Sequence, residues 1–290
     1  MTGVFVFGLG FSGQAFARRA SAFSISGTTR SAQTAEALAE LGLRALVFDG
    51  VRREDDVAQA LREAKAFLVA APPGDSGDPA LRVFADDLLS APRLRRVIYL
   101  STVGVYGGAG GEWIDEGAPT QGASPRVRAR LAAEAHWFDF GRAKKIPVDV
   151  LRLAGIYGPG RNPLVKLREG ASRRIVKPGQ AFNRIHVDDI AGVALKLIAS
   201  DSPGGIWNVA DCEPAPPQDV IVYAAALLGI EPPPEEPFAT ANLTPMQRSF
   251  YASNQRISTR KLQRELGYVW TYPTYREGLQ ACLAAGDGRS

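Results

Sequence analysis

The chain has little cysteine and little histidine, with two residues of each among 290. Cys212 and Cys282 stand far apart and lack the spacing of metal ligands, so the sequence predicts no zinc site. No apolar run reaches the roughly 18 residues that a membrane span requires, so no membrane association is expected. Met1 leads straight into the first apolar strand with no targeting segment before it, which predicts a cytoplasmic location.

An excess of charge of one sign is also missing, because 34 lysines and arginines face 30 aspartates and glutamates and leave a net charge of +4. Short basic pairs such as Arg52–Arg53 and Arg95–Arg96 are typical of solvated surfaces rather than of a track for a polynucleotide. The sequence therefore predicts no binding of nucleic acid. A hydrophobic content of 46% and a charged content of 22% are typical of a globular protein. The length indicates one large or two modest domains.

The first glycine-rich turn is the most informative stretch of the sequence. Residues 4–7 are apolar and predict a buried strand, and Gly8, Gly10 and Gly13 follow before a helical run. In a dinucleotide site the first glycine allows the tight turn, the second lets the backbone approach a pyrophosphate, and the third lets the helix pack on the strand. The alternative is a glycine turn with a structural role only. The residues of this turn predicted to bind a dinucleotide are Gly8, Leu9, Gly10, Phe11, Ser12 and Gly13.

The end of the second expected strand bears on the choice of dinucleotide. An NAD site usually has an acidic side chain about 20 residues after the glycines. Arg30 stands near that point instead. An arginine can grip the additional 2′-phosphate of NADP in a bidentate fork, which favours NADP while leaving NAD possible. The alternative is a solvated arginine at a strand end.

Later strand ends are predicted to reach the same cofactor. Asp49 and Gly50 follow the third strand, where an acid would meet the adenine amino group. Small residues and prolines after the fourth strand would let the loop at 71–74 lie over the cofactor. The residues predicted to bind the dinucleotide outside the glycine turn are Thr29, Arg30, Ser31, Asp49, Gly50, Ala70, Ala71, Pro72 and Ser101.

Strands and helices alternate along much of the chain. The expected strands are 4–7, 23–27, 45–48, 66–70, 96–100, 148–153 and 205–209. The expected helices are 14–19, 32–41, 57–64, 81–89, one that begins at Ser124–Pro125, one that opens at 182–189, 218–228, 258–266, and one that begins with a capping box of Thr274 and Glu277. Such alternation is typical of an α/β fold with a doubly wound parallel sheet covered on both faces.

Three phrases carry a family resemblance: Tyr99–Gly107, Leu151–Gly160 and Ile185–Asp189. Together with the opening glycines they resemble the extended short-chain dehydrogenase/reductases, the NAD-dependent epimerase/dehydratase group that acts on nucleotide sugars. The resemblance covers nearly the whole chain. It implies a Rossmann fold with a smaller C-terminal substrate lobe, and NAD or NADP used in hydride transfer. The implied division is residues 1–160 plus 181–212 for the NAD(P)-binding domain and residues 161–180 plus 213–290 for the substrate-binding lobe.

The resemblance also implies partners. A small-molecule substrate is expected to contact Trp113, Arg161 and Arg184. Family members often dimerise through two helices of each subunit, which here would include residues 125–140, so a homodimer is possible.

In that family a Ser or Thr, a Tyr and a Lys share the catalytic work. Thr102 matches the Ser/Thr position, whereas Arg126 and Arg130 occupy the positions of the tyrosine and the lysine. Arginine stays protonated above about pH 12, so Arg126 cannot shuttle the proton. Arg130 could still place positive charge beside the nicotinamide ribose.

Two tyrosines are candidates for the missing proton donor. Tyr106 and Tyr157 stand at strand ends that are expected to face the cleft, and the alternative is that both are packing residues. His186 is interpreted as a helix-entry residue that ties two segments together rather than as a base.

Two further positions depart from the family pattern. Phe7 replaces the family's first glycine, and Phe182 replaces an arginine that holds the phosphates of the sugar nucleotide. Arg184 lies nearby, and we expect it to point to the face opposite Phe182.

The sequence thus favours an atypical NADP-dependent enzyme that transfers hydride to or from a sugar-like or small carbonyl substrate. The alternative is a non-catalytic NADP redox sensor or scaffold that reports the state of the nucleotide to a partner. The loss of the Tyr/Lys pair beside an intact glycine turn is what that alternative expects. Differential affinity for the oxidised and reduced nucleotide separates the two.

Overall fold

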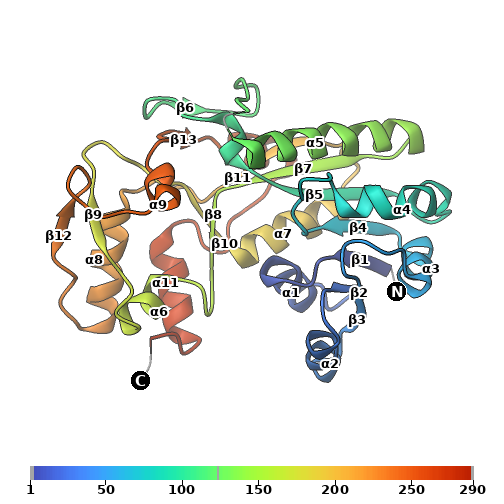
Figure 1. Ribbon diagram of the computed structural model, residues 1–290, viewed down its shortest axis with the longest axis horizontal. Helices are drawn as coiled ribbons and strands as arrows, with labels where there is room; N and C mark the ends of the chain where they lie inside the picture. The colour runs from blue at the N-terminus through green and yellow to red at the C-terminus, as the bar shows by residue number, and fades with distance from the viewer. Residues whose placement is uncertain (1–2, 123, 289–290) are drawn as a thin grey trace.

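The computed structural model describes residues 3–122 and 124–288. Its centre is a parallel sheet of seven strands in the order β11-β7-β5-β4-β1-β2-β3 (Figure 1). The strands are β1 (Gly3–Phe7), β2 (Ser24–Thr29), β3 (Arg44–Val47), β4 (Ala66–Val69), β5 (Arg96–Thr102), β7 (Val148–Leu153) and β11 (Gly205–Val209). The strand order reverses between β1 and β4, as in a doubly wound Rossmann sheet. The predicted fold class is therefore confirmed.

Helices cover both faces of this sheet because successive strand residues point to opposite sides. In β1, Val4 and Val6 join one buried cluster, and Phe5 and Phe7 join another. The helices of the first cluster are α1 (Phe11–Arg19), α2 (Ala32–Glu40), α7 (Val187–Ile198) and α10 (Arg260–Leu266). The helices of the second cluster are α3 (Asp55–Glu63), α4 (Pro79–Ser90) and α5 (Pro125–Lys144). Figure 1 shows α4 and α5 on one side of the sheet and α1 and α7 on the other.

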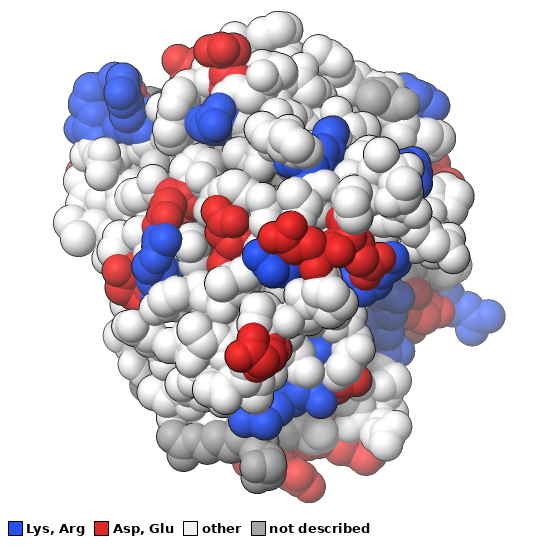
Figure 2. Space-filling view, turned by 90° about the vertical axis from the view of Figure 1, so that its left-hand side faces the viewer, with Lys and Arg blue, Asp and Glu red and all other residues white. Residues whose placement is uncertain are grey.

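A second group of elements, which we call the small lobe, lies to the left in Figure 1. Its elements are α6 (Pro163–Arg168), β9 (Arg174–Val176), α8 (Pro217–Leu228), β12 (Glu235–Pro237), α9 (Pro245–Phe250) and α11 (Tyr275–Ala284). A separate cluster of buried side chains from α6, α8 and α11 forms its core. On the face shown in Figure 2, acidic and basic side chains are intermixed. Across the described ranges, no helix combines the length and the apolar character needed to cross a bilayer.

Three short parallel pairs connect the sheet, the small lobe and their loops. They are β8 (Gly155–Tyr157) with β10 (Arg184–His186), β9 with β12, and β6 (Trp113–Ile114) with β13 (Arg256–Ile257). A 3₁₀ turn, η1 (Val103–Tyr106), follows β5 directly. The pair β8–β10 brings the second and third family phrases side by side.

The predicted helix starts are confirmed where a capping signal is present. Ser124 caps α5 by accepting from the N–H of Val127, and Thr274 and Glu277 form the capping box of α11. His186 caps α7 through its Nδ1 atom, which agrees with its interpretation as a helix-entry residue. Helix α1 begins at Phe11, three residues before the predicted start, because its first turn consists of the glycine motif and carries no helical hydrophobic period.

Candidate functional site

The glycine turn holds α1 against the end of β1. Gly8 has a φ of +104°, and a Cβ there would lie 2.9 Å from the backbone nitrogen of Ala71. A Cβ on Gly13 would lie 2.3 Å from the carbonyl oxygen of Gly8, so the helix packs directly on the strand end. A Cβ on Gly10 would meet nothing within 4 Å. Two of the glycines are therefore required by the protein's own packing, whereas the third borders open space.

The N-terminus of α1 opens toward that space. Gly10 is the N-cap and supplies no side-chain cap. The N–H groups of Phe11, Ser12 and Gly13 have no hydrogen-bond acceptor among the described residues, since the helical ladder starts with Gln14 N donating to Gly10 O at 2.9 Å. Free N–H groups at the positive end of a helix dipole attract anions such as phosphates.

The ends of β2 and β4 lie around the same turn. Thr28 fixes the turn from β2, because its Oγ1 accepts from Gly8 N at 2.9 Å and its carbonyl accepts from Leu9 N at 2.7 Å. Ala70 N and Ala71 N both donate to the carbonyl of Phe7 and hold the β4 exit against β1. The structure thus brings together three of the strand ends predicted to hold a dinucleotide.

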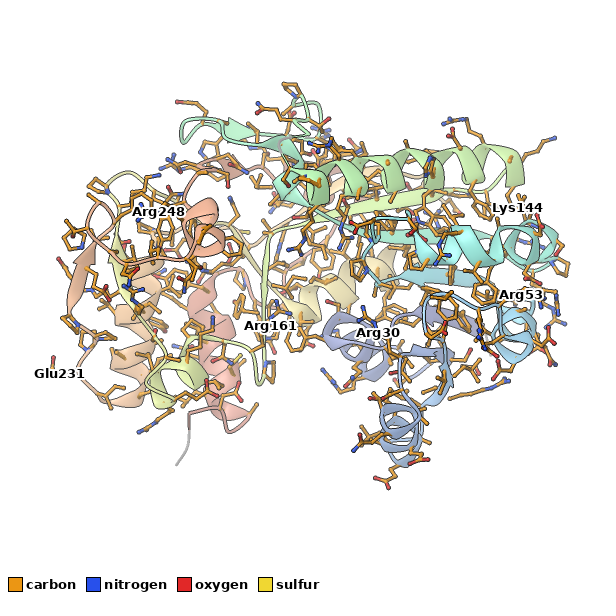
Figure 3. All side chains as sticks on the ribbon, viewed as in Figure 1. Arg30, Arg53, Lys144, Arg161, Glu231 and Arg248 are labelled. Atoms are coloured by element: carbon orange, nitrogen blue, oxygen red, sulfur yellow. The ribbon has the colours of Figure 1, made fainter. Side chains whose placement is uncertain are left out.

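The other predicted cofactor residues lie on loops at these ends. Arg30 is exposed at the end of β2, beside α1 in Figure 3, and has no carboxylate within ion-pair distance in the described chain. Ser31 caps α2 by accepting from Thr34 N at 3.2 Å. Asp49 closes its own turn by accepting from the N–H groups of Val51 and Arg52, which lowers its carboxyl pKa. Thr29, Gly50 and Pro72 complete this set at the exits of β2, β3 and β4.

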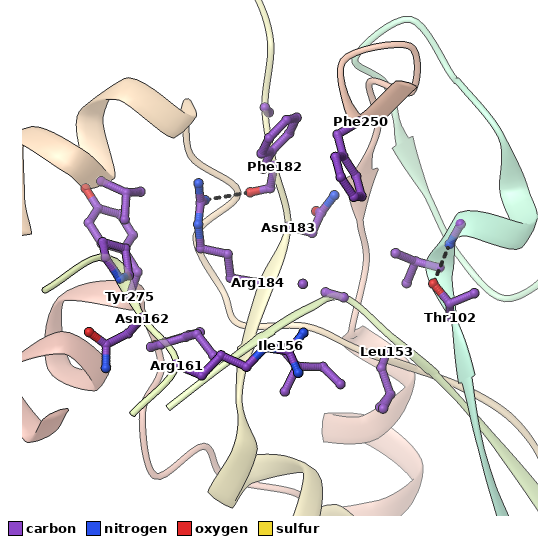
Figure 4. Close-up of a pocket in the computed structure, with 18 of the residues that line it drawn as sticks. Thr102, Leu153, Ile156, Arg161, Asn162, Phe182, Asn183, Arg184, Phe250 and Tyr275 are labelled. Atoms are coloured by element: carbon purple, nitrogen blue, oxygen red, sulfur yellow. Dashed lines mark hydrogen bonds between the residues drawn. The ribbon is translucent and has the colours of Figure 1, made fainter. Parts of the chain in front are cut away.

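A cavity of about 500 Å³ lies between the carboxyl ends of β5 and β7 and the small lobe (Figure 4). Its lining includes four of the predicted catalytic or substrate residues, Thr102, Tyr157, Arg161 and Arg184. Its size is within the range of small-molecule sites in proteins. Trp113 is 59% exposed and is not among the lining residues.

The cavity and the glycine turn are neighbours. The guanidinium of Arg161 lies over the Phe11 ring at 5.5 Å, and a Cβ on Gly158 would lie 3.3 Å from Phe11 Cζ. The loop after β8 therefore packs on the first residue of α1. A ligand on the glycine turn would have this cavity at its side.

Thr102 is placed to contact a ligand. It ends β5, caps η1, and lines the cavity, and its Oγ1 accepts from Gly104 N at 3.1 Å. Its own O–H hydrogen has no acceptor among the described residues. The hydroxyl is therefore free to donate to a group in the cavity.

Tyr106 lies in a buried polar network instead. Its hydroxyl donates to Asn208 Oδ1 at 2.7 Å, and the guanidinium of Arg152 lies over its ring at 4.8 Å. Arg152 holds the carboxylate of Glu134 with a 2.7 Å contact, and the hydroxyl of Ser101 donates to the same carboxylate at 2.5 Å. Burial raises the pKa of Tyr106. The hydroxyl of Ser101, a residue predicted to contact the dinucleotide, is engaged by Glu134.

Tyr157 is also buried. Its hydroxyl lies 3.5 Å from the carbonyl of Thr274, its ring meets His186 edge-on at 5.2 Å, and burial raises its pKa well above the usual range. Burial lowers the pKa of His186 to about 4, so the imidazole is neutral near pH 7. Neither group is suited to exchange a proton at that pH.

The two arginines that the resemblance places at the positions of the family's Tyr and Lys do not line the cavity. Arg126 is exposed and is not among the lining residues of the cavity. Arg130 donates to the carbonyl of Leu100 at 2.6 Å and to the hydroxyl of Tyr99 at 3.2 Å, so its charge lies beside β5. Glu134 stands one helical turn further on and pairs with Arg152 rather than with Arg130.

The expectation that Arg184 points away from Phe182 is wrong, since both side chains line the cavity. Residues two apart in an extended chain share a face, and the segment enters β10 in that conformation. Other lining residues that the sequence did not indicate are Lys166, Asn183, Phe250, Gln255 and Tyr275. They belong to α6, α9, α11 and loops whose meeting depends on the tertiary fold, and no local motif marks them.

A buried carboxyl lies just behind the cavity. Asp211 is 1% exposed, its Oδ1 accepts from Glu213 N at 3.2 Å, and its Oδ2 has no hydrogen-bond partner among the described residues. Burial raises the pKa of Asp211 to about 8. The positive charge of Arg184 on β10 lowers this pKa, whereas the negative charges of Glu213 and of Asp189 on α7 raise it. The carboxyl is therefore protonated at pH 7.

The Asp211→Asn variant tests this protonation state. The folded pKa lies above the unfolded value, so wild-type stability falls as pH rises from about 4 toward 8, by about 1 kcal/mol per pH unit. Asparagine resembles the protonated acid and does not titrate. The free energy of unfolding of the variant should therefore rise relative to that of wild type by about 1 kcal/mol per pH unit between pH 5 and 7. Urea unfolding at several pH values measures the difference. A difference that does not change with pH would contradict the raised pKa.

Comparisons with known proteins agree with this geometry. Residues 83–210 match the model of the NAD dependent epimerase/dehydratase family. This part of the chain is therefore similar to the NAD-dependent epimerase/dehydratase family. The match spans β5, α5, β7, β10, α7 and β11, and so contains the strand ends that border the cavity.

Three individual proteins resemble the chain over nearly its whole length. Protein YeeZ of Escherichia coli K12 is 29% identical over 290 residues that cover 94% of this chain and 97% of YeeZ. A conserved protein from Silicibacter pomeroyi, titled functionally unknown, is 41% identical with a TM-score of 0.88 and covers 99% of this chain and 100% of its own. UDP-glucuronic acid 4-epimerase from Bacillus cereus, solved with UDP-glucuronic acid and NAD, has a TM-score of 0.75, 19% identity and 97% coverage of both chains. The last similarity shows the fold alone.

Proposed function

We propose that the chain binds NADP on the glycine turn and uses it for hydride transfer with a small molecule held in the adjoining cavity. The observation that carries this proposal is the open space at Gly10, the one glycine of the motif whose Cβ would meet nothing, beside three N–H groups of α1 without acceptors. The epimerase from Bacillus cereus that shares the fold was solved with NAD, which supports a dinucleotide here. The nicotinamide would supply or accept the hydride.

In this proposal Gly8 to Gly13 hold the pyrophosphate, and the ends of β2, β3 and β4 hold the adenosine half. Arg30 grips the 2′-phosphate because its guanidinium is exposed and is not neutralised by any carboxylate of the described chain. A planar guanidinium binds a phosphate through two parallel hydrogen bonds. This contact makes NADP preferred over NAD.

Thr102 is the proposed contact for the reacting oxygen of the substrate. Its hydroxyl lines the cavity with a free hydrogen, so it can donate to a carbonyl oxygen as that oxygen gains negative charge. Arg130 is held by Leu100 and Tyr99 and takes no direct part in this step.

The placement of the tyrosines favours a second candidate function. The hydroxyls of Tyr106 and Tyr157 are buried and have raised pKa values, and Arg126 lies outside the cavity lining. A fold that binds the nucleotide without a tyrosine proton donor suits a non-catalytic NADP redox sensor or scaffold. A sensor must bind the oxidised and reduced forms with different affinities.

Calorimetric titration with NADP⁺, NADPH, NAD⁺ and NADH tests both functions. We expect wild type to bind NADP⁺ more tightly than NAD⁺, and Arg30→Ala to weaken NADP⁺ binding by about tenfold while leaving NAD⁺ binding unchanged. Arg44→Ala serves as the control, because Arg44 is exposed at the opposite end of β3.

Each contrary outcome has a distinct meaning. Equal affinity for NADP⁺ and NAD⁺ would contradict the role of Arg30. A strong preference for one redox form would favour the sensor. Failure of all four nucleotides to bind would overturn the proposed site.

A further inference from the structure

Arg184 presents one unused edge of its guanidinium. Its Nη1 atom donates to the carbonyls of Phe182 at 3.0 Å and Ala215 at 3.1 Å. Its Nε and Nη2 atoms have no acceptor among the described residues, and no described carboxylate lies within ion-pair distance of it. The side chain lines the cavity, with the Tyr275 ring centre 6.0 Å from its guanidinium carbon (Figure 4). The backbone contacts on Nη1 hold the free edge in a fixed direction.

The same edge of another arginine shows which group fits it. Arg152 donates to the carboxylate of Glu134 through Nε, at 3.3 Å to Oε1, and through Nη2, at 2.7 Å to Oε2. Two parallel N–H groups match the two oxygens of one carboxylate. The free edge of Arg184 therefore matches the two oxygens of a single carboxylate group.

The charge of the cavity favours such a group. Arg161, Lys166 and Arg184 line it, and no aspartate or glutamate is among the described lining residues. Asp211 lies near Arg184 but forms no ion pair with it, and its raised pKa of about 8 keeps it neutral at pH 7. The positive charge of Arg184 is thus left for a ligand.

Two aromatic rings in the cavity indicate which kind of group the rest of the ligand carries. Phe182 and Phe250 both project into the cavity from different segments (Figure 4). The Phe182 ring packs on Tyr251 with centres 5.2 Å apart, whereas Phe250 is 59% exposed. An apolar, planar body between these rings would cover Phe250 and remove its surface from water.

We propose that the cavity binds an organic carboxylate, with its carboxylate on the free edge of Arg184 and an apolar planar body against Phe182 and Phe250. As the substrate class of the hydride transfer, this inference rests on the proposed function. The carboxylate site itself can be tested without the dinucleotide. Arg184 is then the residue that selects acids over neutral compounds.

The test compares trans-cinnamate with trans-cinnamamide, which has the same planar body but no charge. Both are titrated calorimetrically into wild type, with and without saturating NADP⁺. We expect cinnamate to bind at least about tenfold more tightly, and Arg184→Lys, which keeps the charge but loses the fork, to remove most of that preference. Phe250→Ala is expected to weaken both probes alike, and Arg264→Lys, at an exposed position of α10, to change neither.

Wild type that binds acid and amide equally, or Arg184→Lys that keeps the full preference, would overturn the inference. If the dinucleotide binds and neither probe does, the inference fails and the proposed function stands. If cinnamate binds through Arg184 and no dinucleotide binds, the carboxylate site stands and the proposed function fails. If Arg184→Lys is unfolded in circular dichroism, equal binding of the two probes by wild type still overturns the inference.

Discussion

Replacement of Glu134 by alanine is expected to lower the free energy of unfolding by about 3–5 kcal/mol. Glu134 and Arg152 are each 4% exposed, and the carboxylate accepts from Ser101 as well as from the guanidinium. Removal of the carboxylate leaves the charge of Arg152 buried against the Tyr106 ring with its best acceptor gone. A buried charge without a partner is among the most destabilising changes in a protein interior.

Urea unfolding of wild type and Glu134→Ala measures this loss. Asp139→Ala provides the control, because Asp139 lies on the same helix and pairs with Arg142 on the surface, where a pair contributes about 0–1 kcal/mol. The double variant Glu134→Leu with Arg152→Met should recover much of the loss, since it leaves no unpaired charge. Equal effects of Glu134→Ala and Asp139→Ala would show that the buried pair is not important for stability.

The sheet and its helices could be predicted because their signals are local. The apolar run at 4–7, the glycines after it and the repeated alternation of strands and helices define a parallel sheet before any contact is known. Capping residues such as Ser124 and Thr274 fixed helix starts to the residue. These features depend on neighbours in sequence, which the sequence displays directly.

The cavity could be predicted only in part. Thr102 lies within a family phrase and Arg184 directly before one, but Phe250 and Tyr275 reach the cavity from segments more than 60 residues beyond Arg184. Their positions follow from the packing of α9 and α11, which no local period specifies. The direction of the Arg130 side chain could not be predicted either. The four-residue spacing on the helix permits an ion pair between Arg130 and Glu134. In the fold, Arg130 instead donates to the carbonyl of Leu100 and Glu134 pairs with Arg152.

The glycine turn allows binding and stability to be separated by two matched substitutions. Gly10→Ala is expected to weaken NADP⁺ binding by about 100-fold, because the new methyl group occupies the space where a pyrophosphate would approach the N–H groups of α1 and at least two charge-assisted hydrogen bonds are lost. The φ of Gly10 is −84°, so alanine fits the backbone, and stability should change by less than about 1 kcal/mol. Calorimetric titration and urea unfolding of the same preparations measure the two effects.

Gly13→Ala is the comparison for the loss of stability. Its Cβ would lie 2.3 Å from the carbonyl oxygen of Gly8 and 3.0 Å from Val6 Cγ1, so α1 must move away from β1 and stability should fall by about 1–3 kcal/mol. A Gly10→Ala variant that binds NADP⁺ as wild type does would show that the open space at this glycine is not where the pyrophosphate lies. A Gly10→Ala variant that loses as much stability as Gly13→Ala would show that Gly10, like the other two glycines, serves the packing of the fold.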